Sequence, residues 1–308
     1  MKAIIFPGQG SQKAGMALEF HRDFKIVKDI FKRVDEALKI NLSKIILNGS
    51  DEDLKKTEIT QPAILTTSYA IFSVLKNEYN FDLSKIKYVA GHSLGEYSAL
   101  VASGSLSLED GVILVHERGK LMQAAVPVGK GAMLAVMGLE NNELKSLIKK
   151  FDIKDGICEI ANDNSPGQII LSGSKTTLVS FSNYLKAEKK RSIFLPVSAP
   201  FHCSLMKPAA EKMKIFLQKK EFKNPSYKLI SNVTALPIEN DEEIKDLLYK
   251  QIFSQVRWRE TVEFMIKHDI NDFIEIGPGK VLSGLVKRTD DKVLTRSITK
   301  IDDIKNLQ

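Results

Sequence analysis

A serine between two glycines is the residue of this chain best placed to act as a nucleophile. It lies in the stretch Gly91-His92-Ser93-Leu94-Gly95, after an apolar run and before residues that favour a helix. G-x-S-x-G at a strand-to-helix turn is typical of a nucleophile elbow, where the glycines permit a tight bend and the hydroxyl is exposed. We expect the Leu94 N–H to point toward an oxyanion formed beside Ser93. The alternative is a structural serine in a tight turn.

A serine hydroxyl needs a base to become a good nucleophile, and His202 is the best candidate. It follows an Ala-Pro-Phe stretch, where the main fold is expected to resume after an insertion. We interpret the other histidines as surface or capping residues, or as pointing away from the serine hydroxyl: His21, His116, His268 and His92. No acidic residue stands out as the third member of a hydrolase triad.

The composition is that of an ordinary globular enzyme. The chain has 308 residues, of which 43% are hydrophobic and 27% are charged, which suits one large domain or a core carrying an insertion. The net charge of +7 fits either a well-solvated surface or an anionic partner. Nucleic acid is a weak candidate because no basic run is interleaved with aromatic residues. Cys158 and Cys203 lack metal-ligand spacing and the histidines are far apart, so we expect no metal site.

No segment of the sequence predicts insertion into a membrane. The opening residues MKAIIFPGQG contain an apolar run too short for a signal peptide, and no uninterrupted apolar stretch approaches the length of a membrane span. We therefore expect a soluble, cytoplasmic protein.

Strand-like apolar runs alternate with helical patterns over the first third of the chain. The expected strands are 2–6 and 87–91, and the expected helices are 23–40, 60–79 and 94–103. Pro62 falls near the first turn of the second helix, where a missing N–H is tolerated. This alternation predicts an α/β fold with a mainly parallel sheet and helices on both faces.

The middle of the chain predicts a different unit. Its elements are a strand at 131–138, a helix at 141–151, strands at 156–162 and 167–173 joined by a DNSP turn, a helix at 175–190 and a strand at 191–197. This β-α-β-β-α-β order is typical of a ferredoxin-like unit. We expect an inserted subdomain at 127–198 within a core formed by 1–126 and 199–308. A helix at 204–220 and strands at 228–232 and within 272–279 continue that core.

Several motifs together resemble the malonyl-CoA:acyl carrier protein transacylase family of bacterial type II fatty-acid synthesis. They run in order along nearly the whole chain: FPGQGSQKAGM (6–16), TQPA (60–63), GHSLGEYSAL (91–100), RGKLMQ (118–123), ANDNSPGQIILSG (161–173), PFHCSLM (200–206), SNVTA (231–235) and EIGPGKVLSGLVKR (275–288). The resemblance implies an α/β-hydrolase-like core with a ferredoxin-like insertion. It also implies ping-pong transfer of a malonyl group to the thiol of acyl carrier protein.

The resemblance assigns roles to particular residues. It implies a dyad of Ser93 and His202, with the imidazole oriented by the backbone carbonyl of Gln251 rather than by a carboxylate. That would explain the missing acid and would make the side chain at position 251 less decisive than its backbone. The oxyanion hole would be formed by the backbone N–H groups of Gln9 and Leu94.

The same resemblance implies how the acyl group is selected. Malonyl differs from acetyl by a terminal carboxylate, which the planar guanidinium of Arg118 could hold through two hydrogen bonds. The local sequence taken alone fits a surface arginine equally well. Phe201 matches the bulky residue of malonyl-selective members, and Gln61 and Met122 match walls of the pocket.

The implied substrates, malonyl-CoA and acyl carrier protein, are both acidic. Two basic clusters are therefore candidate docking contacts, although a solvated surface explains each equally well: Lys189, Lys190 and Arg191, and Lys287 and Arg288. The resemblance implies a monomer that needs no cofactor.

Two other classes of function stay open at the level of sequence. A serine hydrolase such as an esterase or patatin-like lipase would share the elbow, but its acid would have to be Asp110, which is better explained as a residue near the start of a helix. A non-catalytic binding module is the more distant alternative.

Overall fold

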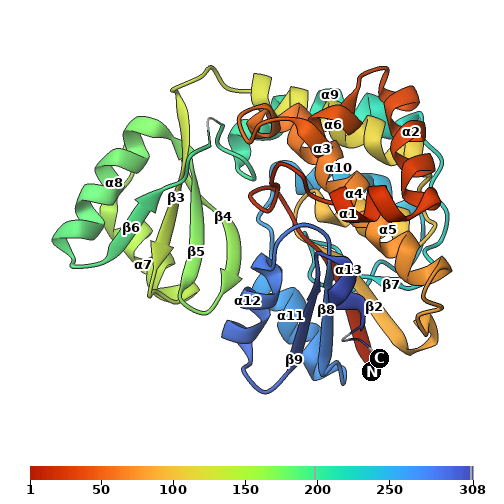
Figure 1. Ribbon diagram of the computed structural model, residues 1–308. Helices are drawn as coiled ribbons and strands as arrows, with labels where there is room; N and C mark the ends of the chain where they lie inside the picture. Colours follow the sequence, from red (N-terminus) through yellow and green to blue (C-terminus); the bar gives the residue numbers. More distant parts are fainter. Residues whose placement is uncertain (198, 306, 308) are drawn as a thin grey trace.

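The structure is a computed structural model that describes residues 1–197, 199–305 and 307. It has an α/β fold with two separate sheets, the smaller at the left of Figure 1 and the larger at the lower right. The larger sheet is parallel, with strand order β7-β2-β1-β8-β9. Its strands are β1 (Lys2–Phe6), β2 (Ile86–Gly91), β7 (Lys228–Leu229), β8 (Asp272–Ile276) and β9 (Leu294–Ile298). The predicted α/β class with a mainly parallel sheet is confirmed.

Helices cover both faces of this sheet. One face carries α2 (Lys25–Leu38), α4 (Thr57–Asn77), α5 (Gly95–Ala102), α6 (Leu108–Ala124), α9 (Lys207–Gln218) and α10 (Glu242–Gln251). The other face carries α11 (Trp258–Lys267) and α12 (Val281–Thr289). Shorter elements are α1 (Leu18–Asp23), α3 (Leu42–Asn48), α13 (Ile301–Lys305) and the 3-10 turns η1 (Asp53–Lys55), η2 (Leu83–Lys85) and η3 (Ser204–Met206).

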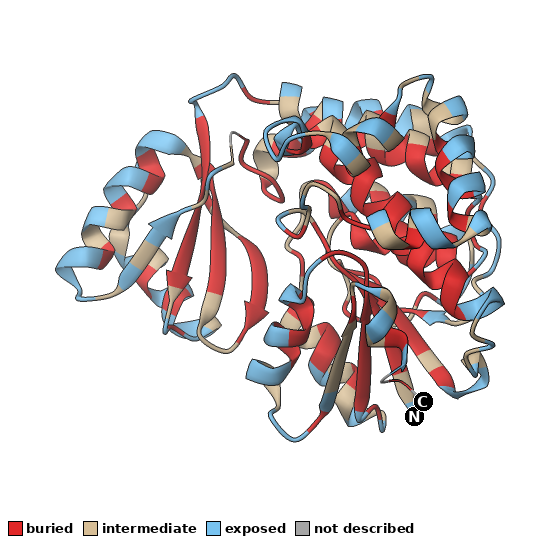
Figure 2. Ribbon diagram, in the orientation of Figure 1, coloured by how far each residue is buried: buried red, intermediate tan, exposed pale blue. Residues whose placement is uncertain are grey.

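The central strand β1 explains this layering. Ile4 and Phe6 pack with the first helical layer, whereas Ala3 and Ile5 pack with α11 and α12. Successive side chains of a strand point to opposite faces of the sheet. An uninterrupted apolar run therefore suits a strand that is covered on both sides. Figure 2 shows β8 as buried, the edge strand β9 as mostly intermediate, and the outer faces of the helices as exposed.

The smaller sheet is antiparallel, with strand order β4-β5-β3-β6. It contains β3 (Gly131–Met137), β4 (Cys158–Ser165), β5 (Gln168–Ser174) and β6 (Arg191–Phe194), with α7 (Asn141–Phe151) and α8 (Lys175–Ala187) packed on one face. The predicted β-α-β-β-α-β order is present. Residue 198 lies outside the described residues, and the division into 1–126 with 199–308 and 127–198 stays a prediction.

Several predicted elements differ in extent from the observed ones. The helix expected at 23–40 is present as α2, which begins at Lys25 after the extended backbone of Phe24 and ends at Leu38. The expected DNSP turn is mostly strand, because β4 runs on to Ser165 through two register shifts. The strand expected at 228–232 stops at Leu229, which frees Asn232 for another role described below.

The position of Pro62 also differs from the prediction. Helix α4 begins at Thr57, so Pro62 lies beyond the first turn and its ring removes a hydrogen bond to the Glu58 carbonyl. That carbonyl is instead within 2.8 Å of the Nδ1 atom of His116 on α6, which can donate to it. The histidine that we interpreted as a surface or capping residue thus ties α6 to α4.

Candidate active site

The turn between β2 and α5 has the geometry of a nucleophile elbow. Ser93 lies in it with a φ of 53°, in the left-handed region that side chains rarely adopt. A Cβ on Gly91 would lie 1.9 Å from the Gly95 carbonyl, and a Cβ on Gly95 would lie 2.2 Å from the Phe6 carbonyl oxygen. The two glycines are therefore required by space, and the predicted strand–turn–helix context of Ser93 is present.

Ser93 and His202 are in direct contact. The Ser93 Oγ atom lies 2.8 Å from His202 Nε2, and His202 Nδ1 lies 2.9 Å from the carbonyl oxygen of Gln251. A carbonyl can only accept, so Nδ1 carries the proton and Nε2 presents a lone pair to the serine hydroxyl. The geometry is that of a serine with its base, and the backbone carbonyl takes the orienting position that a carboxylate has in a triad.

The imidazole of His202 is held in its neutral form. Burial first, and then the positive charge of Arg118, lower the pKa of His202 to about 3. The residue is 4% exposed. A base that stays unprotonated at neutral pH is ready to take the serine proton.

The two residues predicted to form an oxyanion hole, Gln9 and Leu94, belong to segments that meet at the elbow. Leu94 directly follows Ser93 at the start of α5, and the loop that carries Gln9 packs against the elbow, because a Cβ on Gly8 would lie 2.6 Å from the His92 carbonyl oxygen. Among the described residues, neither the Gln9 nor the Leu94 N–H donates to a protein acceptor. Free donors beside a nucleophile can stabilise a tetrahedral oxyanion.

Arg118 is buried beside the nucleophile and is not a surface residue. Its Nη2 atom donates to Ser93 Oγ at 3.1 Å, and its side chain is 1% exposed. The guanidinium also donates to Gln61 Oε1 and to Gln251 Oε1, at 2.8 Å each. These partners are all neutral, and within the described residues Nε has no partner. A buried cation with an unused donor is suited to an anionic ligand.

Comparison with known proteins identifies the family of the chain. Residues 3–305 match the acyl transferase domain family. A malonyl CoA-acyl carrier protein transacylase of Bacillus subtilis is 43% identical over 96% of this chain and 93% of its own. The chain belongs to the malonyl CoA-acyl carrier protein transacylase family. It is an acyltransferase.

Solved structures of the transacylase family share the whole fold. The transacylase of Clostridium perfringens is 41% identical, with a TM-score of 0.94 over 99% of this chain and 95% of that one. A malonyl-transacylase solved in complex with its type II PKS acyl-carrier protein is 38% identical, with a TM-score of 0.94 over 99% of this chain and 98% of that one.

In this member of the transacylase family, the side chain of Gln251 makes contacts in the site that the prediction, which concerned its backbone carbonyl, did not include. Its Nε2 atom donates to the Ser93 carbonyl oxygen at 2.9 Å and to Glu96 Oε2 at 2.7 Å, while its Oε1 atom accepts from Arg118. Gln251 therefore contacts the nucleophile, the base and the buried arginine together.

Asn232 is a site residue whose role sequence reasoning missed. Its Oδ1 atom accepts from the Ser93 N–H at 2.7 Å, and its Nδ2 atom donates to the Gly91 carbonyl oxygen at 2.7 Å. The asparagine thus clamps both sides of the elbow from a loop that follows β7. The motif SNVTA pointed to this residue but not to its role.

His92 is directed away from the serine hydroxyl, as predicted. Its Nε2 atom lies 2.9 Å from Asn164 Oδ1 on β4, and its ring packs against Trp258 on α11. The neighbour of the nucleophile therefore connects the elbow to the smaller sheet.

The other predicted pocket residues are buried near the dyad. Gln61 contacts Arg118, Phe201 precedes His202 in the chain, and Met122 lies one turn beyond Arg118 on α6. Contact of Phe201, Gln61 and Met122 with an acyl group stays a prediction.

The two predicted docking clusters lie on different elements. Lys189, Lys190 and Arg191 form the turn from α8 to β6, where Lys190 pairs with Glu143 at 2.7 Å. Lys287 and Arg288 end α12; Lys287 donates to the carbonyl oxygens of Asp291 and Val293, and Arg288 donates to Gln168 on β5. All but Lys190 are exposed, and the structure does not place them in contact with the dyad.

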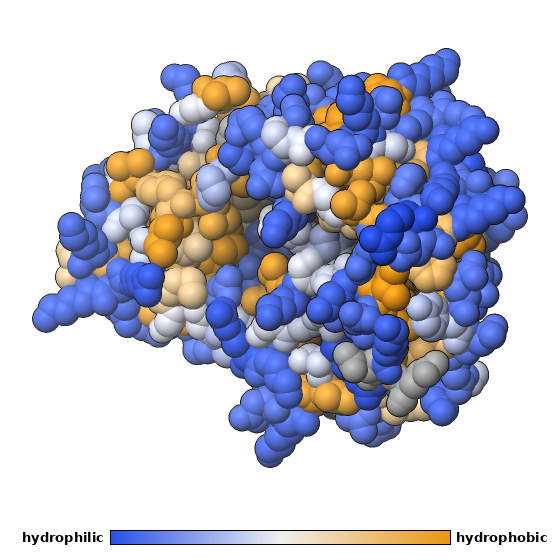
Figure 3. Space-filling view, viewed as in Figure 1, coloured by the Kyte–Doolittle hydropathy of each residue, from blue (hydrophilic) through white to orange (hydrophobic). Residues whose placement is uncertain are grey.

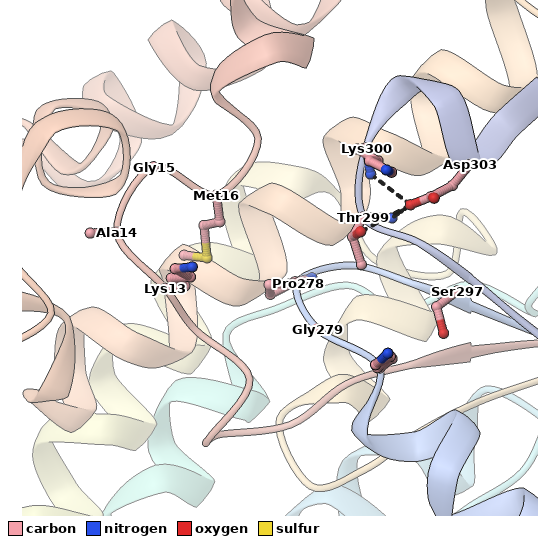
Figure 4. A pocket seen from close by; sticks show the side chains of 11 residues that line it. Lys13, Ala14, Gly15, Met16, Pro278, Gly279, Ser297, Thr299, Lys300 and Asp303 are labelled. Atoms are coloured by element: carbon pink, nitrogen blue, oxygen red, sulfur yellow. Dashed lines mark hydrogen bonds between the residues drawn. The ribbon is translucent and has the colours of Figure 1, made fainter.

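Two cavities are lined in part by the segment that follows β1. One cavity, of about 340 Å³, lies between the loop that follows β1, the start of α4 and the segment that follows β6. It is lined by Gln9, Lys55, Thr57, Pro196 and Val197. Figure 3 shows the surface hollowed between the smaller sheet and the rest of the molecule. The other, of about 610 Å³, is drawn in Figure 4 and has three lysines in its lining, Lys13, Lys280 and Lys300.

The alternative catalytic acid, Asp110, is explained by its place in a helix. Asp110 lies in the first turn of α6 and pairs with Lys220 at 2.6 Å, so it is the helix-start residue that we expected. In the described part of the chain, no group of His, Cys, Asp or Glu side chains is arranged to hold a metal ion, and no helix is long and apolar enough to cross a membrane.

Proposed function

We propose that this acyltransferase moves a malonyl group from malonyl-CoA to the phosphopantetheine thiol of an acyl carrier protein, through a malonyl ester on Ser93. The transfer would supply malonyl units for fatty-acid chain elongation. The names of the relatives and the titled complex with an acyl-carrier protein support these substrates.

One observation supports the acyl group in particular. The guanidinium of Arg118 lies 3.1 Å from the nucleophilic oxygen, is buried, and has only neutral partners. An acyl group bound to Ser93 that ended in a carboxylate would bring its charge to this arginine. An acetyl group would leave the buried charge without such a partner.

In the first half-reaction, His202 Nε2 takes the hydroxyl proton as Ser93 Oγ attacks the thioester carbon. The Gln9 and Leu94 N–H groups stabilise the oxyanion, which collapses as the C–S bond breaks and the imidazolium protonates the CoA thiolate. In the second half-reaction the carrier-protein thiol gives its proton to His202, attacks the ester carbon and releases Ser93, which recovers the proton.

Transfer to a thiol requires that water be kept from the ester. We infer that the cleft between the core (1–126 and 199–308) and the insertion (127–198) admits the pantetheine arm, and the cavity lined by Gln9 and Val197 supports this. The cycle uses no cofactor beyond its two substrates.

The acidic partners suit the net charge of +7. We propose Lys189, Lys190, Arg191, Lys287 and Arg288 as docking contacts for the carrier protein and the nucleotide phosphates, with charge reversal expected to raise the KM for the carrier protein. A cytoplasmic, monomeric enzyme without nucleic-acid or membrane partners completes the proposal.

Mass spectrometry of the intact protein tests the proposal directly. Incubation with malonyl-CoA should add one malonyl group at Ser93, and acyl carrier protein should remove it as malonyl-carrier protein. The S93A variant should gain no adduct. Release of free malonate that outpaces transfer would instead support a serine hydrolase.

A further inference from the structure

Glu96 is a buried carboxyl group whose contacts connect the separate parts of the dyad. It lies in the first turn of α5, three residues after Ser93, and is fully buried. Its Oε2 atom accepts from the Asn232 backbone N–H at 3.1 Å and from Gln251 Nε2 at 2.7 Å. Among the described residues, Oε1 has no partner.

The two groups that donate to Glu96 are those that hold the nucleophile and its base. Asn232 clamps the Ser93 N–H and the Gly91 carbonyl. Gln251 bonds the Ser93 carbonyl with its side chain and His202 with its backbone. Glu96 thus joins the clamp on the elbow to the residue that orients the imidazole.

Glu96 also fixes which way the Gln251 amide faces. With Nε2 directed at two acceptors, Glu96 Oε2 and the Ser93 carbonyl, the Oε1 atom faces the Arg118 guanidinium. A reversed amide would set its NH2 group against a cation that can only donate, and its oxygen against two acceptors. Without Glu96 one of the acceptors that prevent this reversal would be lost.

We propose that Glu96 is a positioning residue, whose Oε2 acceptor fixes Asn232 and Gln251 and thereby aligns Ser93 with His202. The inference rests on the proposed function for its reaction, but not for its geometry. Burial raises the pKa of Glu96 to about 7, so its neutral form is well populated at neutral pH. Glutamine is therefore a close mimic, since it keeps an acceptor at the Oε2 position.

The test compares E96M, which keeps the volume without an acceptor, with E96Q, which keeps the acceptor. A fluorophosphonate probe reads dyad reactivity without any acyl donor: a Ser93 Oγ–P bond forms, fluoride leaves, and His202 takes the hydroxyl proton. We expect E96M to label about 10- to 100-fold more slowly, as is typical when reacting groups are slightly misplaced. E96Q should label within about threefold of wild type by the same argument.

Glu275 offers a matched control. It is also a fully buried glutamate, and its oxygens accept from the backbone N–H groups of Leu282 and Ser283 at the start of α12. E275M and E96M should each lower the melting temperature, yet E275M should label at close to the wild-type rate. In malonyl transfer, E96M should lower kcat by the same factor as labelling, with little change in KM for malonyl-CoA.

Each outcome decides the inference. Labelling of folded E96M at the wild-type rate would overturn it. An equal loss of labelling rate in E96Q would also overturn it and would point to the charge of Glu96. An equal loss of labelling rate in E275M would overturn it too and would point to general destabilisation. If the wild-type enzyme is labelled but does not transfer malonyl, the proposed function fails. In that case the positioning role would still be supported if E96M is labelled slowly and both E96Q and E275M are labelled at close to the wild-type rate.

Discussion

Arg118 brings a positive charge into the interior beside a serine hydroxyl, and its partners there are neutral amides and that hydroxyl. No carboxylate of the described residues bonds directly to this guanidinium, and the Glu96 carboxyl acts on it only through its electrostatic field, so a ligand carboxylate at the arginine would be favourable. The sequence around Arg118 fitted a surface residue equally well, because burial depends on where α6 packs. The residue-scale predictions below follow from this charge and from the histidine that lies near it.

Removing the guanidinium should change the choice of acyl group. We expect R118A to lower kcat/KM for malonyl-CoA by on the order of 10²-fold or more, because two charge-assisted hydrogen bonds are lost. The kcat/KM for acetyl-CoA should fall much less, so the ratio of the two values is the measurement. Arg22 is exposed and pairs only with Asp23 in the described structure, which makes R22A the control. An unchanged ratio in R118A would contradict the proposed role.

The pH dependence of the reaction should reflect a histidine that resists protonation. His202 acts as a base only when neutral, and its pKa of about 3 lies below the ordinary value of 6.5. Activity should therefore persist as the pH falls from 7 to 5, and kcat/KM measured by brief pH jumps should show no half-loss near 6.5. Stability should behave differently from activity. The contribution of His202 to the free energy of unfolding has its full value above pH 6.5 and falls as the pH drops from 6.5 toward 3, because the unfolded chain takes up a proton there that the folded chain does not.

At the scale of elements, the elbow is fixed by the close approach of β1, β2 and α5. Gly95 begins α5 directly against the Phe6 carbonyl, and Gly91 ends β2 against the first turn of that helix. The motif thus specifies backbone packing as well as an exposed hydroxyl. Clamping of the turn by Asn232 then holds Ser93 in its left-handed conformation.

A methyl group at the elbow should therefore disrupt the fold locally. G95A places its Cβ 2.2 Å from the Phe6 carbonyl oxygen, so we expect a large loss of unfolding free energy and of dyad labelling. G284A is the control, since Gly284 lies within α12 and a Cβ there meets nothing within 4 Å. That change should be neutral or stabilise the protein by about 0.5–1 kcal/mol in denaturant unfolding. Equal stability of the two variants would contradict this account.

At the scale of the whole molecule, strand β4 joins the smaller sheet to the larger part. The Asp163 N–H donates to the Val256 carbonyl oxygen at 3.0 Å, and the Asp163 carboxylate bonds Arg259 on α11. Asn164 meets His92 beside the nucleophile. The link therefore reaches from the smaller sheet to the elbow itself.

Weakening this link should cost stability. In D163N the buried carboxylate loses its charge, and Arg259 loses its strongest partner. In the wild type, the hydrogen bond from Arg259 to Asp163 raises the pKa of the arginine. We expect the unfolding free energy to fall by about 1.5–3 kcal/mol. D246N breaks an exposed pair with Lys250 and should change it by less than about 1 kcal/mol. A D163N effect as small as that of D246N would show that the link contributes little.

The sequence by itself determined what local chemistry and periodicity carry. G-x-S-x-G after an apolar run defines the elbow because only glycine fits where the strand and the helix backbones pack closely together. The alternation of strand-like and helical patterns predicted both the parallel sheet and the β-α-β-β-α-β unit. Contacts between residues a few positions apart, or within one repeat of a pattern, are determined by the local sequence itself.

The sequence named His202 as the base for Ser93, but only the tertiary structure showed that contact and the other partners of the serine. His202 is 109 residues away, Asn232 is 139 away and Gln251 is 158 away, and no periodicity links them. The burial of Arg118 and the donors around Glu96 were equally invisible, since each depends on which helices pack together. Hydrogen bonds form between neighbours in space, and the order of strands and the packing of helices decide which distant residues become neighbours.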